Sequence, residues 1–532
     1  MQRFVHFVML AHGWRRALLM LAAGAVAGLS VPPLFVLPSL FVGLPVLVWA
    51  LDGAETGRGW RRIFGAPFFI GFWFGLGYFA VAIHWIGFAF FAEGGWVPVL
   101  APFGVGLLAA ILALFWGAAA ALAHFLWSEN GFRVVVLAAA LALAEFARGH
   151  MFTGFPFDLL GYALTANDQM MQAASLVGVY GLSFVAPLVA ATPALIWPAL
   201  DRPLSRRLMP FFAALSVLAA QLAFGAIRLE TTETNLRDDM RVRMVQPNID
   251  EAAQWLAADG EFVLSRLIEI SEAVGNPDAP GLATITHLIW PESAFPFYLS
   301  RKPEALARIA RLLPPGSLLI TGAPRLDPED PLGRTARNAI LAIDENGEIV
   351  ASYYKSHLVP FGEYLPFAEF FAGFGITQFV PGNDGWTAGG PRRLMKPPAT
   401  PAFLPLICYE AVFPGALGPV ADAQFILNLT NDGWFDRSIG KEQHFHHARL
   451  RAVEQGKPMI RLANTGVSAV IDPLGRLAVT LKPDSVGLAD FAPPNPIAAP
   501  PFAMWGHLPL LATLLAAFFG ALALRRRDPG EI

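Results

Sequence analysis

The distribution of apolar residues divides the chain into three parts. Long, nearly uncharged runs fill residues 1 to about 228 and recur at about 503–524, whereas the segment between them has the mixed pattern of a globular domain. A bilayer core of about 30 Å takes roughly 20 helical residues to cross. By that rule the sequence predicts eight membrane spans, at about 14–31, 33–51, 66–91, 97–127, 132–147, 170–198, 208–227 and 503–524. The fifth span is short and ends in AEFARGH.

The middle segment alternates short β-rich runs with helical stretches. The strand-like runs end at Pro, Gly or Asn and read RVRMVQPNI, THLIWPES, SLLITGAPR, LPLICYE, QFILNLTND and PMIRLANTG. Two hairpins are expected, one turning at Asn346-Gly347 and the other around residues 473–475. Helices are expected at 258–274, 303–313 and 441–457. The pattern predicts a layered α/β domain.

The expected organisation is therefore a transmembrane domain, a soluble domain and a final anchor. The transmembrane domain of about seven helices takes residues 1–228, and the α/β domain takes 229–495. Residues 496–532 supply the last membrane helix and a short tail, after the Pro-rich linker APPNPIAAPP.

Composition supports a membrane protein. The chain is 55% hydrophobic and 15% charged, against roughly 25% charged residues in soluble domains. The net charge of −3 provides no basic field, so no nucleic-acid partner is expected. The only cysteine, Cys408, excludes a disulfide within the chain.

Arginines in the short connecting segments predict the orientation. Basic residues occur at 3–16, 58–62, 202–207 and 525–527, and these four segments fall on one side of the membrane if eight spans are present. Because Lys and Arg accumulate on the cytoplasmic side, both termini are predicted to be cytoplasmic and the α/β domain lies on the far side. The triplet AVA at 25–27 offers an alternative, a signal-peptidase site. Cleavage there would invert every later loop, so an uncleaved anchor is expected.

Three polar residues end strand-like runs of the α/β domain. Glu292 follows HLIWP, Lys355 ends the second strand of the Asn-Gly hairpin, and Cys408 ends LPLI. A thiol needs a base or a nearby cation to become a thiolate, a carboxylate in an apolar pocket can be that base, and an ammonium can stabilise an oxyanion. The alternative is that Cys408 is an inert core residue.

The sequences around these residues carry a family resemblance. WPES, YYKSHLVPFGEYLP and ICYEAVFP, in this order, resemble the nitrilase (carbon–nitrogen hydrolase) superfamily, and residues 431–475 look like the remainder of that domain. With eight spans framing it, nearly the whole chain is similar to the bacterial apolipoprotein N-acyltransferase family. The resemblance implies an α-β-β-α sandwich for the soluble domain and a helical bundle for the rest.

The resemblance also implies residue roles. It makes Glu292 the general base, Lys355 the oxyanion-stabilising cation and Cys408 the nucleophile. Glu363 matches a second carboxylate that supports the lysine or the base. Further supporting or substrate-binding positions are Tyr409, Glu410, Trp255 and Asn338.

The implied reaction transfers an acyl chain between two lipid-anchored molecules. The donor is a phospholipid, with the sn-1 chain of phosphatidylethanolamine expected, and the chain passes through a Cys408 thioester. The acceptor is the α-amino group of an N-terminal diacylglyceryl-cysteine, in the final step of lipoprotein maturation. The resemblance implies a monomer in the bacterial inner membrane, with its catalytic domain in the periplasm and with neither a metal nor another cofactor.

Several alternatives remain open on the sequence. A membrane-tethered amidase would share the three catalytic residues, and a transporter would use the soluble domain for regulation. His444, His446 and His447 suggest a metal site or a helix packed near the cleft. Glu145 and Arg148 either pair for structural support or hold a lipid headgroup. The Phe- and Gly-rich stretch 367–386 is either a mobile arm at the membrane or part of the core.

Overall fold

The chain forms two compact units. The computed structural model describes residues 1–55, 64–91, 97–197, 203–249, 260–274, 281–327, 330, 335–373, 385–415, 417–418, 420–435 and 438–525. Unit 1 comprises Met1–Gly87, Val99–Thr232 and Pro500–Ile532, and unit 2 comprises Phe88–Pro98 and Glu233–Ala499. The junctions after Thr232 and Ala499 lie close to the boundaries expected at 228 and 495.

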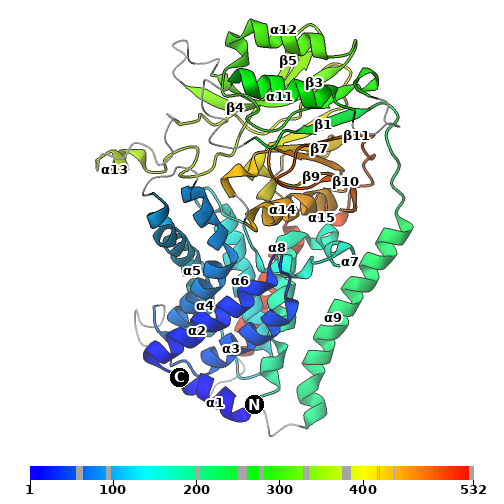
Figure 1. Ribbon diagram of the computed structural model, residues 1–532. Coiled ribbons are helices and arrows are strands. Elements are labelled where there is room, and N and C mark those ends of the chain that lie inside the picture. Colours follow the sequence, from blue (N-terminus) through cyan, green and yellow to red (C-terminus); the bar gives the residue numbers. More distant parts are fainter. Residues whose placement is uncertain are drawn as a thin grey trace. The chain divides into compact units, whose positions relative to one another are not determined.

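The described residues of unit 1 form helices joined by turns and short irregular segments. Its α-helices are α1 (Gln2–Leu10), α2 (Gly13–Ala27), α3 (Leu40–Asp52), α4 (Ala66–Ala82), α5 (Ala101–Phe125), α6 (Phe132–His150), α7 (Asp168–Met171), α8 (Ala174–Ala190), α9 (Leu204–Thr231), α15 (Pro501–Trp505) and α16 (Leu508–Arg525) (Figure 1). Apolar side chains from most of them pack into one core, because the segments are apolar on nearly every face.

Three described helices are long and apolar enough to cross a membrane: Pro98–Phe125, Ala174–Leu195 and Leu204–Thr231. A fourth span results if Ala66–Ala82 and His84–Phe91, bent by 50° between them, count as one. The other predicted spans correspond to α2, α3, α6 and α16, which fall short of those limits of length or composition. Eight spans therefore stay a prediction. The helix α3 is shorter than expected, because a turn and the 3-10 segment Leu37–Ser39 take up its start.

Unit 2 contains two β-sheets. The first has the strand order β11-β1-β2-β3-β4-β5 and the second β10-β9-β8-β7-β6. Their bounds are β1 (Val242–Gln246), β2 (His287–Ile289), β3 (Leu318–Leu326), β4 (Ala336–Asp344), β5 (Ile349–Tyr354), β6 (Phe403–Ile407), β7 (Phe425–Thr430), β8 (Met459–Ala463), β9 (Ser468–Ile471), β10 (Leu477–Leu481) and β11 (Gly487–Phe491). Each sheet has three consecutive parallel strands followed by two antiparallel ones.

Helices cover the outer faces of these sheets, which gives the predicted four layers (Figure 1). The helices are α11 (Gly260–Glu272), α12 (Pro303–Leu312) and α14 (Gly440–Gln455), and the short α13 spans Ala368–Ala372. Because side chains alternate between the two faces of a sheet, successive residues of one strand pack in different cores. On β3, Leu319 packs with the α11 and α12 side chains, whereas Ile320 packs between the sheets against β7. A third core joins β6 and β7 to α14.

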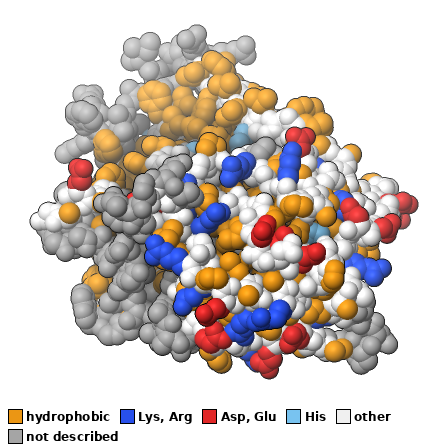
Figure 2. Space-filling model, turned by 90° about the horizontal axis from the view of Figure 1, so that it is seen from above, with side chains coloured by type: hydrophobic (Ala, Val, Ile, Leu, Met, Phe, Trp, Pro, Cys, Tyr) orange, Lys and Arg blue, Asp and Glu red, His pale blue; other side chains and the backbone are white. Residues whose placement is uncertain are grey.

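The surface of unit 2 has the mixed charge of a soluble domain. Over α11 and α12, basic side chains alternate with acidic ones, and Arg266 pairs with Glu269 at 2.9 Å. Figure 2 shows Lys and Arg side chains interspersed with Asp and Glu on the visible face. Of the expected arm at 367–386, residues 374–384 lie outside the described residues, and Phe367 beside them is 74% exposed.

Candidate active site

The Glu292 carboxylate lies beyond the end of β2, where a close backbone approach fixes it. The N–H of Gly322 on β3 donates to the Pro291 carbonyl at 3.0 Å. A Cβ at Gly322 would lie only 2.5 Å from the Cα of Glu292, so only glycine fits there. The neighbouring Ser293 adopts φ +50°, which turns the chain sharply after the carboxylate.

Glu292 is buried and accepts two short hydrogen bonds. Asn338 Nδ2 donates to Oε1 at 2.8 Å, and the backbone N–H of Asn431 donates to Oε2 at 2.7 Å. Burial raises the pKa of Glu292, Glu363 raises it further, and the charge of Lys355 together with these hydrogen bonds opposes the rise. A carboxylate with a raised pKa can take up and return a proton near neutral pH.

Lys355 follows β5 and is 1% exposed. Its Nζ lies 2.8 Å from Glu363 Oε1 and 3.7 Å from Glu292 Oε1. Burial alone would lower the pKa of Lys355, but the two carboxylates raise it above its ordinary value, so the side chain is an ammonium. Glu363 is fixed in turn by the Val359 N–H, which donates to Oε2 at 2.8 Å.

Cys408 begins the 3-10 helix Cys408–Val412 directly after β6. Its backbone is in the left-handed region, with φ +47°, which costs free energy in a residue other than glycine. Burial raises the pKa of its thiol, Glu292 raises it further, and Lys355 lowers it. The thiol is therefore protonated at rest and needs a base before it can act as a nucleophile.

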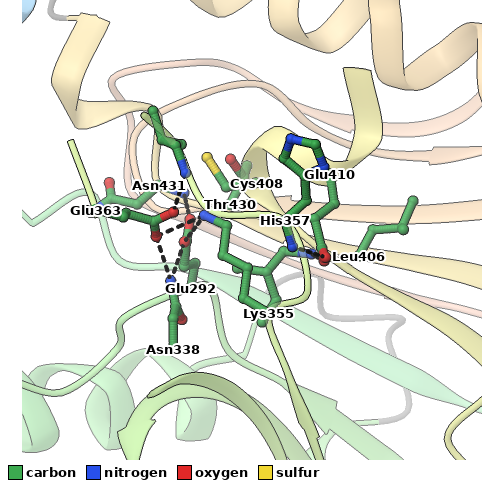
Figure 3. Close-up of polar contacts among 12 residues, drawn as sticks. Glu292, Asn338, Lys355, His357, Glu363, Leu406, Cys408, Glu410, Thr430 and Asn431 are labelled. Atoms are coloured by element: carbon green, nitrogen blue, oxygen red, sulfur yellow. Dashed lines mark hydrogen bonds and ion pairs between the residues drawn. The ribbon is translucent and has the colours of Figure 1, made fainter. Parts of the chain in front are cut away.

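These groups converge on one place in unit 2 (Figure 3). The Glu292 and Glu363 carboxylates flank the Lys355 ammonium, the Asn338 amide donates to both carboxylates, and the Cys408 sulfur lies beside them. Carboxylate, ammonium and thiol together can carry out nucleophilic substitution at a carbonyl. Of the supporting residues that the sequence predicted here, Glu363 and Asn338 contact the central three directly.

Glu410 lies close to Lys355 and Cys408, and its hydrogen bonds connect the segments that carry them. Its side chain is completely buried and accepts hydrogen bonds from the Ile407 N–H at 2.8 Å, the Ser356 N–H at 2.9 Å and the Tyr353 hydroxyl at 2.9 Å. The Ile407 N–H lies on the strand before Cys408, whereas the Ser356 N–H and the Tyr353 hydroxyl lie on either side of Lys355. Figure 3 shows Glu410 beside Lys355 and His357. Glu410 thus holds the two segments together.

The other residues that the sequence suggested for the site are Tyr409, Trp255 and three histidines. Tyr409 is buried, with its ring 4.9 Å from that of Phe413. Trp255 lies outside the described residues. In the described part of the chain, no three His, Cys, Asp or Glu side chains form a group that could hold a metal. Of the three histidines on α14, His444 contacts Asp432.

Glu145 and Arg148 form an ion pair in unit 1. Their side chains are fully buried and 3.0 Å apart, so of the two alternatives the structure shows the pairing. Trp116 Nε1 donates to Glu145 Oε1 at 2.8 Å, and the Leu160 N–H donates to Oε2 at 3.2 Å. Arg148 Nη1 donates to the Phe155 carbonyl. The pair thereby ties α6 to α5 and to the segment that follows it.

The sequence analysis missed two asparagines of the site. Asn431 follows β7 and supplies the N–H that holds Glu292. Asn464 follows β8, donates to Asn431 Oδ1 at 3.2 Å and also bonds the backbone of Ile249 in both directions. Both residues end apolar strand-like runs, as Cys408 does, but these runs do not show which group each asparagine meets.

Comparisons with known proteins agree with these two units. Residues 23–192 match the family described as apolipoprotein N-acyltransferase N-terminal domain, and residues 241–492 match the carbon-nitrogen hydrolase family. The chain is 42% identical over 536 residues to an apolipoprotein N-acyltransferase of Rhodopseudomonas palustris, with 100% of this chain and 99% of the relative covered. A relative of the same name from Bradyrhizobium diazoefficiens is 43% identical, with 98% and 96% covered.

Solved structures match the chain at low identity. An amidase from Nesterenkonia sp. is 19% identical with a TM-score of 0.35, and the match covers 53% of this chain and 98% of that chain. Likeness at this level carries no inference about activity.

Proposed function

Because the chain belongs to the apolipoprotein N-acyltransferase family, we propose that it moves an acyl chain from a membrane phospholipid to the N-terminal amine of a lipid-modified protein. The observation that carries this proposal is the meeting of Glu292, Lys355 and Cys408 in one buried site. The donor is the sn-1 chain of phosphatidylethanolamine, and the acceptor is the α-amino group of a diacylglyceryl-cysteine.

In the first half of the reaction, Glu292 takes the proton of the Cys408 thiol. The thiolate attacks the ester carbonyl, and the developing oxyanion is stabilised by the Lys355 ammonium and by the Tyr409 N–H. When the tetrahedral intermediate collapses, the bond to the glycerol oxygen breaks and Glu292 returns the proton to that oxygen. The products are a Cys408 thioester and a lysophospholipid.

In the second half, the neutral α-amino group of the acceptor attacks the thioester carbonyl. A nitrogen–carbon bond forms, the carbon–sulfur bond breaks, and Glu292 moves the amine proton to the departing sulfur. The amide product leaves Cys408 as a thiol. Glu292 is suited to this double use because burial and a neighbouring carboxylate raise its pKa, while Lys355 keeps it within reach of ionisation.

The membrane part has a physical role in this scheme. Donor and acceptor are both anchored in lipid, so a tethered enzyme meets them at a high effective concentration. We place both termini in the cytoplasm, eight spans in the bacterial inner membrane and unit 2 in the periplasm. The basic segments at 3–16, 58–62, 202–207 and 525–527 support this orientation. We expect a monomer.

A transfer assay distinguishes acyl transfer to a peptide from hydrolysis of an amide. The purified chain is incubated with vesicles of phosphatidylethanolamine carrying a labelled sn-1 chain and with a diacylglyceryl-cysteine peptide, and the peptide mass is followed. The expected result is a peptide heavier by one labelled acyl chain. A matched peptide with an acetylated N-terminus stays unchanged. Release of ammonia from a short amide, with no labelled peptide, would instead identify an amidase.

A further inference from the structure

A buried polar cluster lies against the nucleophile turn. We call Asn428, Asp432, His444 and Arg461 the turn cluster; they come from β7, the segment after it, α14 and β8, and each is at most 1% exposed. Arg461 donates to the Asp432 carboxylate at 2.8 Å and to the Asn428 side chain. None of the reaction steps above uses these residues.

Two of its members bond the backbone on either side of Ile407. Asn428 Nδ2 donates to the Leu406 carbonyl at 3.1 Å. His444 Nε2 lies 3.2 Å from the carbonyl oxygen of Cys408. Because a carbonyl oxygen only accepts hydrogen bonds, the Nε2–H of His444 is the donor.

The Cys408 carbonyl belongs to the peptide bond that directly follows the residue in the left-handed region. A backbone at φ +47° persists in a cysteine only when its surroundings hold it. The same backbone conformation determines where the Cα–Cβ bond of Cys408 points, and so which positions its Sγ can reach. A side chain that holds this carbonyl therefore limits where the thiol can lie.

The imidazole of His444 is itself held from its other edge. Its Nδ1, which is the acceptor when Nε2 carries the hydrogen, takes a hydrogen bond from Arg461 Nη2 at 3.2 Å. Asp432 Oδ1 lies 2.8 Å from the same nitrogen and accepts from Thr430 Oγ1 at 3.0 Å. Asp432 Oδ2 is bound by Arg461. The ring therefore has a fixed orientation and cannot turn away from Cys408 without breaking a buried network.

We propose that His444 is a positioning residue of the acyl transfer: oriented by Arg461, it holds the Cys408 carbonyl and keeps the thiol aimed at Glu292 and Lys355. The inference rests on the proposed function, because it takes Cys408 as the nucleophile. His444 touches neither the lipid nor the reacting atoms. It acts through the backbone of Cys408, which is a role that nothing in the resemblance or the comparisons assigns.

Two substitutions of His444 distinguish a role in positioning Cys408 from a role in filling space. In His444→Gln, an amide N–H can occupy the place of Nε2 and donate to the Cys408 carbonyl. In His444→Asn, the shorter side chain keeps a polar group near Asp432 but does not reach the carbonyl. His446→Gln is the matched control, since it removes a buried histidine from the same helix.

The first measurement is the single-turnover rate of acyl-enzyme formation from phosphatidylethanolamine, followed by intact mass below the unfolding temperature of every variant. We expect His444→Asn to lose about 10²-fold in rate, as a small misplacement of a reacting atom does, with an unchanged KM for phospholipid. We expect His444→Gln and His446→Gln to stay within about tenfold of the wild-type rate. Equal rates for the Asn and Gln variants would overturn the proposal.

Alkylation of Cys408 by iodoacetamide keeps the two proposals distinguishable. This reaction reports how well the thiol is placed beside its base and needs no lipid. If the wild type forms no acyl-enzyme but the Asn variant is alkylated more slowly than the Gln variant, the transferase proposal fails and the positioning role of His444 stands. If acylation occurs in the wild type and all variants react alike, only the inference about His444 is wrong.

Discussion

The Lys355 ammonium lies 3.7 Å from the Glu292 carboxylate, within ion-pair range but beyond a direct hydrogen bond. Its close partner is Glu363, at 2.8 Å. Lys355 therefore acts on Glu292 through its charge and leaves that carboxylate able to accept a proton. This division of work between the two carboxylates leads to the first two predictions.

The first prediction concerns the pH dependence of acylation. Glu292 is active as a base only when ionised, and its pKa is raised by burial, so the acylation rate should rise with pH through that raised pKa. Glu292→Gln should lose about 10²–10⁴-fold in rate, the usual contribution of a general base. Its rate should also no longer rise with pH through this pKa. Single-turnover acylation between pH 4 and 8 measures both effects. If the rate of the variant still rises with pH in the same way, another group is the base.

The second prediction concerns Lys355. In Lys355→Met the oxyanion loses its cation and two buried carboxylates lose their counter-charge, so we expect acylation to fall by about 10²–10³-fold or more. Lys355→Arg should not restore the rate, because a planar guanidinium does not fit the place of a compact ammonium. Intact-mass kinetics with phospholipid measure this. A Met variant within about tenfold of the wild type would exclude an oxyanion role.

The third prediction separates support from substrate binding at Glu410. Glu410→Gln keeps the shape but replaces one acceptor oxygen by a donor, so a buried N–H or hydroxyl loses its partner at a cost of about 1–3 kcal/mol. We expect a lower unfolding temperature and a lower kcat, with the KM for phospholipid unchanged. A raised KM with normal stability would mean that Glu410 binds substrate.

The fourth prediction uses two glycines of unit 2. In Gly322→Ala the new Cβ would lie 2.5 Å from the Glu292 Cα, so the catalytic carboxylate must move and activity should fall by about 10²-fold. Gly390→Ala is the control, since nothing lies within 4 Å of its added Cβ. Transfer assays at equal protein load compare the two. Equal activities would mean that the loop holding Glu292 adapts without cost.

The strands of unit 2 were largely predictable because they are buried apolar runs. LPLI and its neighbour FILNLT are buried, largely apolar stretches that pair in parallel, and each is followed at once by polar site residues. The strand β11, Gly487–Phe491, was missed. It lies at a sheet edge, all its residues are only half-buried, and its sequence GLADF has no apolar run. Its pairing with β1, far away in the sequence, makes it a strand.

The site was predictable in part. Glu292, Lys355 and Cys408 each end a recognisable strand, and the family resemblance adds Glu363 and Asn338, but the other partners depend on contacts across the fold. Asn431 meets Glu292 across 139 positions in the sequence. His444 lies in the helix that could be expected to pack near the cleft, but only the structure shows that its Nε2 meets the Cys408 carbonyl. Sequence patterns report local burial and period, and they carry no information on such pairings.

The central claim is that the Cys408 thiol takes an acyl chain from a phospholipid. The most direct test is the intact mass of the purified protein after incubation with phosphatidylethanolamine and no acceptor. The account predicts an added acyl mass that neutral hydroxylamine releases and that Cys408→Ala never acquires. An unmodified Cys408 with the lipid intact, in a protein that hydrolyses a small amide, would contradict it.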